Sequence, residues 1–406
     1  MPSASFWQRL VLKHIRVLLE ESDSYTLPEV ESFLDFVDRT LIQLDALGPD
    51  PTSSSSGWKS YLTDDHSPVE YSLSIKKDFC TTRFAFEPLS TDTDSINHDA
   101  PIQWLSKQSI DADGKLWFDT LVKLLTITPS LSSNGLKSDE HIKHVARGLT
   151  QHIFAFDLAK KPLLKSYIFH DALARQVAVS ASDWGEEKDR LLFQAMDALG
   201  LSTPWKKVAS YLSHLRNSHP KYAGQTEFIG WDMVSPDTSR MKVYVRFANA
   251  GLPQLLSHLD LGGALDPDKA QIQEIKAAAT EMWQAFLGED QLSTSDINNC
   301  DTRTQGVILY YELKKNHPDP SAKFYLPVRH YLSSDLLIAE RFDAFLAHKQ
   351  LRESGWYLAM LQKYCDHRKL DSRPGLQTMV GCANRNGEWE VSMYLSAEVF
   401  APERWI

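Results

Sequence analysis

The feature that most constrains the fold of this chain is a short motif, a cation followed two residues later by a tyrosine. Its copies are Lys165-Ser166-Tyr167, Lys242-Val243-Tyr244 and Lys323-Phe324-Tyr325. The three lysines lie about 80 residues apart, a similar step of 165 − 83 = 82 residues leads back to Arg83, and a shorter step of 394 − 325 = 69 residues leads from Tyr325 to Tyr394. Each copy lies in a run with strand character, where residues i and i+2 point to the same face. The repeats therefore predict one surface that carries cations and phenol rings, as an anionic ligand site would.

The segment 240–247 shows how clearly the two faces of such a run separate. One face carries Arg240, Lys242, Tyr244 and Arg246, and the other carries Met241, Val243, Val245 and Phe247. An antiparallel sheet with one solvated face and one core face would give the same alternation. A solvated face has no reason to repeat tyrosine, however, so the recurrence favours the ligand site.

Length and composition narrow the class of protein. With 406 residues, of which 43% are apolar, the chain can bury a large core. The net charge of -10 argues against a nucleic-acid surface, which needs basic patches. Four widely spaced cysteines suit a reducing cytosol, so we expect a cytoplasmic protein. No apolar run approaches the roughly 18 residues of a membrane span, and the N-terminus begins with an amphipathic helix, not a signal core.

Amphipathic patterns predict helices between the polar strands. The expected helices are 5–21, 28–47, 101–108, 115–126, 138–158, 185–200, 204–217, 252–260, 267–288, 333–349 and 353–366. Strand pairs thus alternate with helix pairs, and no break is long enough for an interdomain linker. Such a sheet closes most naturally as a barrel with helices outside and a polar lumen. We therefore expect a single barrel domain over 1–406, with the N-terminal helices of 5–47 packed outside it.

These residues give the chain a family resemblance. It resembles the fungal aromatic prenyltransferases of the dimethylallyltryptophan synthase type, from about Trp58 to the C-terminus. The resemblance rests on the order and spacing of the segments 62–72, 83–88, 155–158, 165–167, 241–244 and 323–331. It implies an α+β fold, a ten-stranded antiparallel β-barrel of repeated α–β–β–α units around a polar lumen. It also implies transfer of a dimethylallyl group from dimethylallyl diphosphate to an indole-containing acceptor by electrophilic aromatic substitution.

The resemblance also implies roles for the repeated residues. The residues that match the diphosphate-binding cations of the family are Arg83, Lys165, Arg240, Lys242 and Lys323. The residues that match the tyrosines around the prenyl group are Tyr167, Tyr244, Tyr325 and Tyr394. Cations aimed at the leaving diphosphate stabilise its developing charge. Phenol faces stabilise the allylic cation by roughly 0.5–2 kcal/mol per ring and keep water away from it.

Two residues are candidates for catalysis. Glu70 matches the carboxylate that accepts a hydrogen bond from the indole N–H in the family; the alternative is a glutamate on the surface of a strand. His152 aligns with a basic residue that removes the ring proton, and a histidine titrates in the range that this requires. The alternative for His152 is a helix residue with no chemical role.

We expect no metal and no other cofactor. The segment 64–68 (Asp-Asp-His-Ser-Pro) lacks the third acid of the Asp-Asp-x-x-Asp motif that binds Mg²⁺ in many prenyl-diphosphate enzymes. Fixed cations would replace the metal, as the resemblance implies. The expected partners are the two small-molecule substrates, without nucleic acid or membrane, and a homodimer is left open.

The sequence constrains the acceptor substrate less than the donor substrate. The segment 221–227 contains no arginine, where family members that use free tryptophan often carry one for its carboxylate. This favours an acceptor without a free carboxylate, such as a cyclic dipeptide or a larger indole alkaloid. Two alternatives stay open: prenylation of a phenol or other non-indole aromatic, and a non-catalytic barrel that binds phosphorylated ligands.

Overall fold

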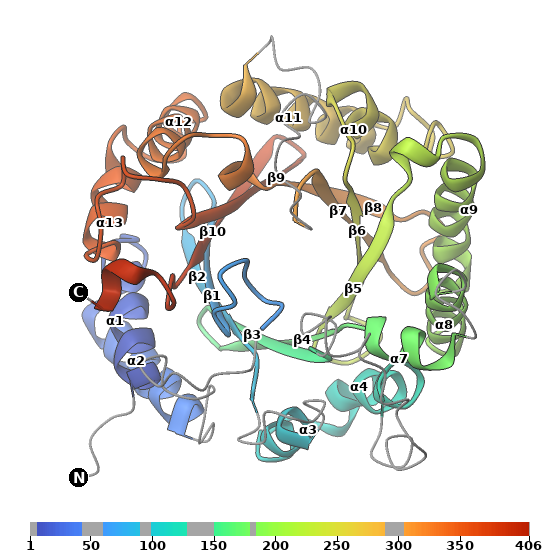
Figure 1. Ribbon diagram of the computed structural model, residues 1–406, viewed down its shortest axis with the longest axis horizontal. Coiled ribbons are helices and arrows are strands. Elements are labelled where there is room, and N and C mark those ends of the chain that lie inside the picture. Colours follow the sequence, from blue (N-terminus) through green and yellow to red (C-terminus); the bar gives the residue numbers. More distant parts are fainter. Residues whose placement is uncertain are drawn as a thin grey trace.

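Ten strands close into an antiparallel barrel in the computed structural model, which describes residues 6–42, 60–89, 99–127, 150–178, 184–288 and 304–405 (Figure 1). Each strand pairs with its neighbours in the chain, and β1 pairs with β10 to close the ring. The strands are β1 (Val69–Ile75), β2 (Cys80–Phe86), β3 (His152–Leu158), β4 (Leu163–Ile168), β5 (Gln225–Asp232), β6 (Met241–Phe247), β7 (Val307–Leu313), β8 (Ser321–Leu326), β9 (Gln377–Arg385) and β10 (Glu388–Ser396). The expected α+β barrel is confirmed.

The helices surround the barrel on its outside, as Figure 1 shows. They are α1 (Phe6–Glu20), α2 (Leu27–Ile42), α3 (Asp99–Ser106), α4 (Ala112–Leu125), α7 (Asp171–Val177), α8 (Trp184–Ala198), α9 (Ser202–Ser218), α10 (Leu252–Leu259), α11 (Ala270–Leu287), α12 (Asp335–His348) and α13 (Trp356–Tyr364), with short 3₁₀ turns at η2 (Pro220–Tyr222), η4 (Val328–His330) and η5 (Pro402–Trp405). Among the described residues, no helix has both the length and the apolar character needed to cross a membrane.

The hydrophobic core fills the space between the strands and the surrounding helices. Phe84 and Phe86 point outward from β2, and Phe154 points outward from β3. Trp104 of α3 packs edge-on against Phe86, with ring centroids 5.0 Å apart, and lies 4.6 Å from the ring of Phe154. Burying each such side chain contributes about 1.5–3 kcal/mol. Because the apolar faces of the strands pack against the helices outside the barrel, the polar faces point into the lumen, as the alternation in 240–247 predicts.

One expected helix is wrong. The sequence analysis assigned 138–158 to a helix, but His152–Leu158 form strand β3. In this strand both faces carry apolar residues, and a continuous apolar run does not distinguish a strand from a buried helix. Residues 138–149 lie outside the described part of the chain. Helix α7 was not expected from the sequence.

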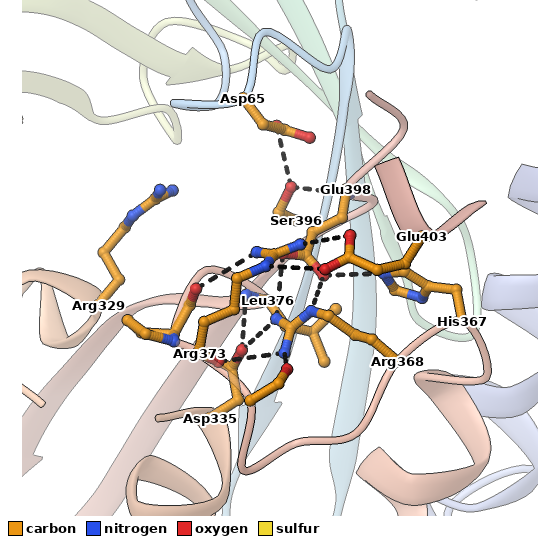
Figure 2. Close-up of polar contacts among 12 residues, drawn as sticks. Asp65, Arg329, Asp335, His367, Arg368, Arg373, Leu376, Ser396, Glu398 and Glu403 are labelled. Atoms are coloured by element: carbon orange, nitrogen blue, oxygen red, sulfur yellow. Dashed lines mark hydrogen bonds and ion pairs between the residues drawn. The ribbon is translucent and has the colours of Figure 1, made fainter. Parts of the chain in front are cut away.

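A buried cluster of ion pairs joins the start of β9, the end of β10 and α12 (Figure 2). Arg368 donates from Nε to Glu398 Oε2 at 2.8 Å and from Nη2 to Asp335. Asp335 also accepts from the backbone N–H groups of Leu376 and Gln377, at 3.1 and 2.9 Å. The Arg368 and Asp335 side chains are only 2% and 0% exposed. The cluster therefore fixes the last two strands that close the barrel.

The Arg368→Met variant tests the contribution of this cluster to stability. The substitution leaves the buried carboxylates of Asp335 and Glu398 with fewer partners, and breaking a buried pair in this way costs about 3–5 kcal/mol. We expect a loss of that size in the free energy of unfolding measured by urea titration. Arg16→Met is the control, because Arg16 of α1 pairs with Glu20 and with Glu31 of α2 at the solvent-exposed surface, and it should leave the midpoint nearly unchanged. Equal midpoints for the two variants would contradict this role.

Candidate active site

The lumen of the barrel is lined by inward-facing side chains that form three successive layers. Along β6, Lys242, Tyr244 and Arg246 are two residues apart and all line the lumen, so each marks one layer. The pairing of β6 with β7 places Glu312, Tyr310 and Ile308 opposite these three residues. One end of the lumen is therefore ionic, its middle is aromatic, and its other end is of mixed character.

The ionic layer contains all five cations expected from the sequence, together with four carboxylates that the sequence analysis missed. The carboxylates are Asp157, Asp232, Glu312 and Glu390. Lys165 Nζ lies 2.6 Å from Asp157 Oδ2, and Arg83 Nε lies 3.2 Å from Asp157 Oδ1. Cations and acids thus alternate around the barrel wall. To find these acids from the sequence, one would have to know which residues of β3, β5, β7 and β10 face the lumen.

The other three cations of this layer are paired in the same way. Arg240 lies 3.1 Å from both Asp232 and Glu312, and Lys242 Nζ lies 3.3 Å from Asp232. On the far side, Lys323 Nζ lies 3.5 Å from Glu390 Oε1, and Arg83 lies 3.6 Å from the same oxygen. These contacts form two groups in the ionic layer, one of Arg83, Lys165 and Lys323 around Asp157 and Glu390, and one of Arg240 and Lys242 around Asp232.

Burial lowers the pKa values of the lysines in this layer. Desolvation is the largest cause for Lys165, and its pKa falls to about 7 although Asp157 raises it. The pKa values of Lys242 and Lys323 are also lowered, again chiefly by burial. An anion that enters this layer would favour the charged forms of all three lysines.

The aromatic layer brings together the four tyrosines expected from the sequence. Ring centroids are 6.2 Å apart for Tyr167 and Tyr244, 6.4 Å for Tyr244 and Tyr325, and 5.6 Å for Tyr325 and Tyr394. Two further rings that the sequence analysis missed, Tyr310 and Phe228, pack against them. The sequence analysis missed Tyr310 because β7 is a nearly continuous apolar run with a tyrosine on each face, so its inward side could not be recognised.

Two glycines determine where two of these rings lie. Gly230 of β5 is paired with Tyr167, and Gly381 of β9 is paired with Tyr325. A Cβ atom at either glycine would lie 2.4 Å from the partner's ring. Each phenol ring therefore lies flat across a glycine of the neighbouring strand, in space that any side chain would fill.

Glu70 lies on the lumen face of β1, at the end remote from the ionic layer. Its side chain accepts a hydrogen bond from Thr378 Oγ1 at 3.3 Å, and the residue is 8% exposed. Burial, with smaller contributions from the charges of Asp64 and Asp65, raises the pKa of Glu70 to about 8. The sequence-based placement of Glu70 on a polar face agrees with this geometry.

His152 does not lie in the lumen, which corrects the sequence-based alignment. The lumen-lining residues of β3 are Ile153, Ala155 and Asp157, whereas His152 faces the helices. Its buried ring lies 5.8 Å from the ring of Phe118 in α4. Successive residues of a strand point to opposite faces, so the strand backbone separates His152 from the lumen. This position does not support a role as the base that removes a ring proton there.

The loop before β1 covers part of the end of the lumen where Glu70 lies (Figure 1). Tyr61 OH donates to Glu227 Oε2 at 2.5 Å, and Asp64 Oδ2 lies 3.2 Å from Arg329 Nε. Thr304 Oγ1 donates to Asp64 at 2.7 Å. These contacts connect the loop to β5, to η4 and to the segment before β7. Among the described residues there is no cluster of three or more histidine, cysteine or acidic side chains placed to hold a metal ion.

A barrel with a ring of cations at one end and a ring of tyrosines in the middle defines an aromatic prenyltransferase, and comparisons with known proteins agree. The chain belongs to the family described as tryptophan dimethylallyltransferase, which matches residues 3–365. It is 29% identical over 371 residues to a 4-O-dimethylallyl-L-tyrosine synthase of Claviceps purpurea, covering 87% of this chain and 79% of the relative. It is 26% identical to a 7-dimethylallyltryptophan synthase of Aspergillus fumigatus, covering 86% of this chain and 75% of the relative. The protein is therefore a prenyltransferase.

Solved structures show the same fold. The crystal structure of AnaPT from Neosartorya fischeri has a TM-score of 0.78 and 19% identity, over 97% of this chain and 95% of that one. NotF in complex with brevianamide F and DMSPP has a TM-score of 0.75 and 21% identity, over 98% of this chain and 96% of that one. The barrel with surrounding helices is thus a known prenyltransferase architecture.

Proposed function

We propose that this protein transfers a dimethylallyl group from dimethylallyl diphosphate to an indole acceptor. The observation that carries the proposal is the order of the layers: five cations, then a ring of tyrosines, then the buried carboxyl group of Glu70. This order matches a donor bound by its diphosphate, a prenyl group between phenol rings, and an aromatic ring held next to Glu70.

The reaction follows from these positions. The C–O bond to the diphosphate breaks and its electron pair leaves with the diphosphate, which Arg83, Lys165, Arg240, Lys242 and Lys323 stabilise. The allylic cation lies among the tyrosines, which attract it and exclude water. The indole carbon then forms the new C–C bond, and the ring carbon loses its proton to the released diphosphate, which is a base held in the same lumen. Glu70 accepts the indole N–H hydrogen bond and stabilises positive charge that develops on the ring nitrogen.

A phenolic acceptor is the second candidate. One relative is named for dimethylallyl transfer to the 4-oxygen of tyrosine. A carboxyl group with a pKa of about 8, as in Glu70, is in its ionised form a strong enough base to take the proton of a phenol. In this case the new bond is C–O and the phenol proton moves to Glu70.

An acceptor panel tests the proposal and separates its two forms. The purified protein is incubated with dimethylallyl diphosphate and with indoles, cyclic dipeptides or phenols, and products are detected by their gain of one C5H8 unit. Carbon-prenylated indole supports the first form, and an O-prenylated phenol as the main product supports the second. Release of diphosphate without any prenylated aromatic would overturn both.

Transfer should not require a divalent metal. The four carboxylates of the ionic layer are already paired with lysine or arginine, and these cations can stabilise the diphosphate directly. We expect the initial rate to be retained in excess EDTA. A rate that disappears in EDTA and returns only with Mg²⁺ would contradict the expectation.

Replacing Gly381 with alanine should impair the shielding of the allylic cation. The added Cβ would strike the ring of Tyr325 and displace it, which opens space for water among the tyrosines. We expect the ratio of dimethylallyl alcohol to prenylated product to rise several-fold, and Gly230→Ala should act similarly through Tyr167. Gly185→Ala is the matched control, because nothing lies within 4 Å of the added Cβ there. An unchanged product ratio in both lumen variants would show that the rings do not depend on these glycines.

A further inference from the structure

The short connections within the five strand pairs all lie at the ionic end of the barrel. They are 76–79, 159–162, 233–240, 314–320 and 386–387. Asp157, Asp232 and Glu312 each stand at one of the last two positions of a strand that runs into such a connection. Glu70, in contrast, is the second residue of β1, so it lies at the opposite end, where the connections that contain helices join the strands. The barrel therefore has a hairpin end, formed by the five short connections, and an acceptor end next to Glu70.

The hairpin end is basic, although the net charge of the chain is -10. Three of its five connections carry a pair of adjacent lysines, and these three contain only two acids. One of the two, Asp319, is already paired with Lys207 and Lys269. A rim of positive charge attracts anions over about one Debye length, roughly 8 Å at physiological salt. The lysines of this rim, called the hairpin-end lysines, are Lys76, Lys77, Lys160, Lys161, Lys314 and Lys315.

Two hairpin-end lysines contact acids of the ionic layer. Lys76 Nζ lies 3.7 Å from Glu390 Oε2, and the other oxygen of Glu390 lies 3.5 Å from Lys323 Nζ in the lumen. Lys314 Nζ lies 2.9 Å from Glu312 Oε1. The side chains of Lys76 and Lys314 are 61% and 43% exposed. Alternating charges therefore connect the solvent at the hairpin end with the ionic layer.

The ionic layer is itself more exposed at its outer edge than further inside. The side chain of Arg240, which directly precedes β6, is 32% exposed, and that of Glu390 is 31% exposed. Lys242, two residues further along β6, has a side chain that is only 6% exposed. An anion in this layer can thus move toward the hairpin end by passing from buried cations to exposed ones.

The order of the layers restricts the other direction. After transfer, the prenylated aromatic lies among the tyrosines and beside Glu70, between the diphosphate and the acceptor end. The loop before β1 covers part of that end through the contacts of Tyr61 and Asp64. A diphosphate that left this way would have to wait for the product. It would then have to pass the phenol rings, whose negative faces repel an anion.

We propose that inorganic diphosphate leaves through the hairpin end, drawn outward by the hairpin-end lysines, while the prenylated aromatic leaves through the acceptor end. The inference rests on the proposed function and adds a release step to it. The donor enters through the acceptor end with its diphosphate leading, because entry from the hairpin end would drive the apolar dimethylallyl group through the ionic layer first. The ion pair between Lys76 and Glu390 is largely exposed and therefore weak, so its opening adds little to the barrier for release.

Diphosphate exchange in the presence of acceptor tests the route. The probe is radiolabelled inorganic diphosphate, and its association and dissociation rates are measured by rapid filtration. The protein is used alone or saturated with the best acceptor of the panel, which cannot react without a donor and only occupies the acceptor end. We expect both rates to be nearly unchanged by the acceptor. Rates that fall in proportion to occupancy by the acceptor would overturn the inference, because both ligands would then use one end.

The double variant Lys76→Gln/Lys314→Gln tests the hairpin-end lysines. Glu390 keeps its contact with Lys323, and Glu312 keeps its contact with Arg240, so neither acid loses all its partners. We expect both rates for inorganic diphosphate to fall by about 3-fold to 10-fold at low ionic strength, the lower end of electrostatic steering effects. The difference from the wild-type protein should shrink as salt is added. Because both rates fall, Kd should change less than either.

Lys13→Gln/Lys363→Gln is the matched control. These exposed lysines of α1 and α13 pair with Asp366 and Glu21, so the variant loses the same charge and the same kind of contact on the outside of the barrel. Its diphosphate rates should equal those of the wild-type protein.

Two results with the double variant would overturn the inference. Unchanged rates would show that diphosphate does not pass the hairpin-end lysines. Faster dissociation with weaker binding would show that these lysines hold the bound diphosphate instead of lining its route. Failure of the proposed function would appear separately, as the absence of any prenylated aromatic in the acceptor panel, and the diphosphate rates of the variants would still decide the route.

Discussion

Glu70→Gln is expected to lower the rate of prenylation on the order of 10²-fold or more, with the fold and donor binding retained. Glutamine can still accept a hydrogen bond from an indole N–H. It cannot stabilise positive charge on the ring nitrogen, and it cannot take the proton of a phenol. Because ionisation of the donor does not depend on Glu70, slow formation of dimethylallyl alcohol should persist. The measurement is single-turnover product formation with saturating donor.

The pH dependence of the prenylation rate tests whether Glu70 is the carboxyl group that activates the acceptor. With its pKa raised to about 8, Glu70 is mostly protonated at pH 7 and ionises as the pH passes through about 8. The ionised form is the one that helps the acceptor, so the wild-type rate should rise with pH across this range and the Glu70→Gln rate should not. Glu340→Gln, at an exposed position of α12, is the control. A native rate in Glu70→Gln with every indole would make Glu70 a structural residue and move the acceptor assignment toward phenols.

Lys165→Met is expected to weaken binding of the donor by roughly 1.5–3 kcal/mol, the contribution of a hydrogen bond to a charged group. Calorimetry with an unreactive thio-diphosphate analogue measures this directly. Asp157 keeps its contact with Arg83 at 3.2 Å in the variant, so the carboxylate does not become an unpaired buried charge. Lys242→Met and Lys323→Met should have smaller or similar effects. Unchanged affinity in all three variants would show that these lysines do not bind the donor.

The Asp157→Asn variant complements Lys165→Met, because it removes the charge of the carboxylate and keeps the lysine. Asp157 holds Lys165 at 2.6 Å and repels the diphosphate, so the amide should bind the donor as well as the native carboxylate or better. Because the pKa of Lys165 is about 7, the lysine takes up a proton when the donor binds above that pH. Wild-type affinity should therefore decline as the pH rises above 7. This decline should be smaller in Lys165→Met.

The fold and most of the lumen could be predicted because strands such as β6 alternate strictly between polar and apolar residues. In β6, every second residue is a cation or a tyrosine, and the residues between them are apolar. Asp157 and Glu312 were missed because their strands carry apolar residues on both faces, so the inward side could be assigned only from the pairing register. His152 shows the consequence of such an error, since a shift of one residue along β3 moves a side chain from the lumen to the helices. Gly230 and Gly381 act through contacts with neighbouring strands that no single segment reveals.

The pairing of β1 with β10 determines when this chain becomes an enzyme during its synthesis. Ser74 of β1 and Glu390 of β10 are hydrogen-bonded although 316 residues separate them. Glu70 and Tyr394 thus meet in one lumen only after the last strand has left the ribosome and has been added to the sheet. Until then both edge strands expose unpaired backbone groups, which other chains can pair with and aggregate. Loss of the C-terminal strand should therefore reduce soluble yield as well as activity.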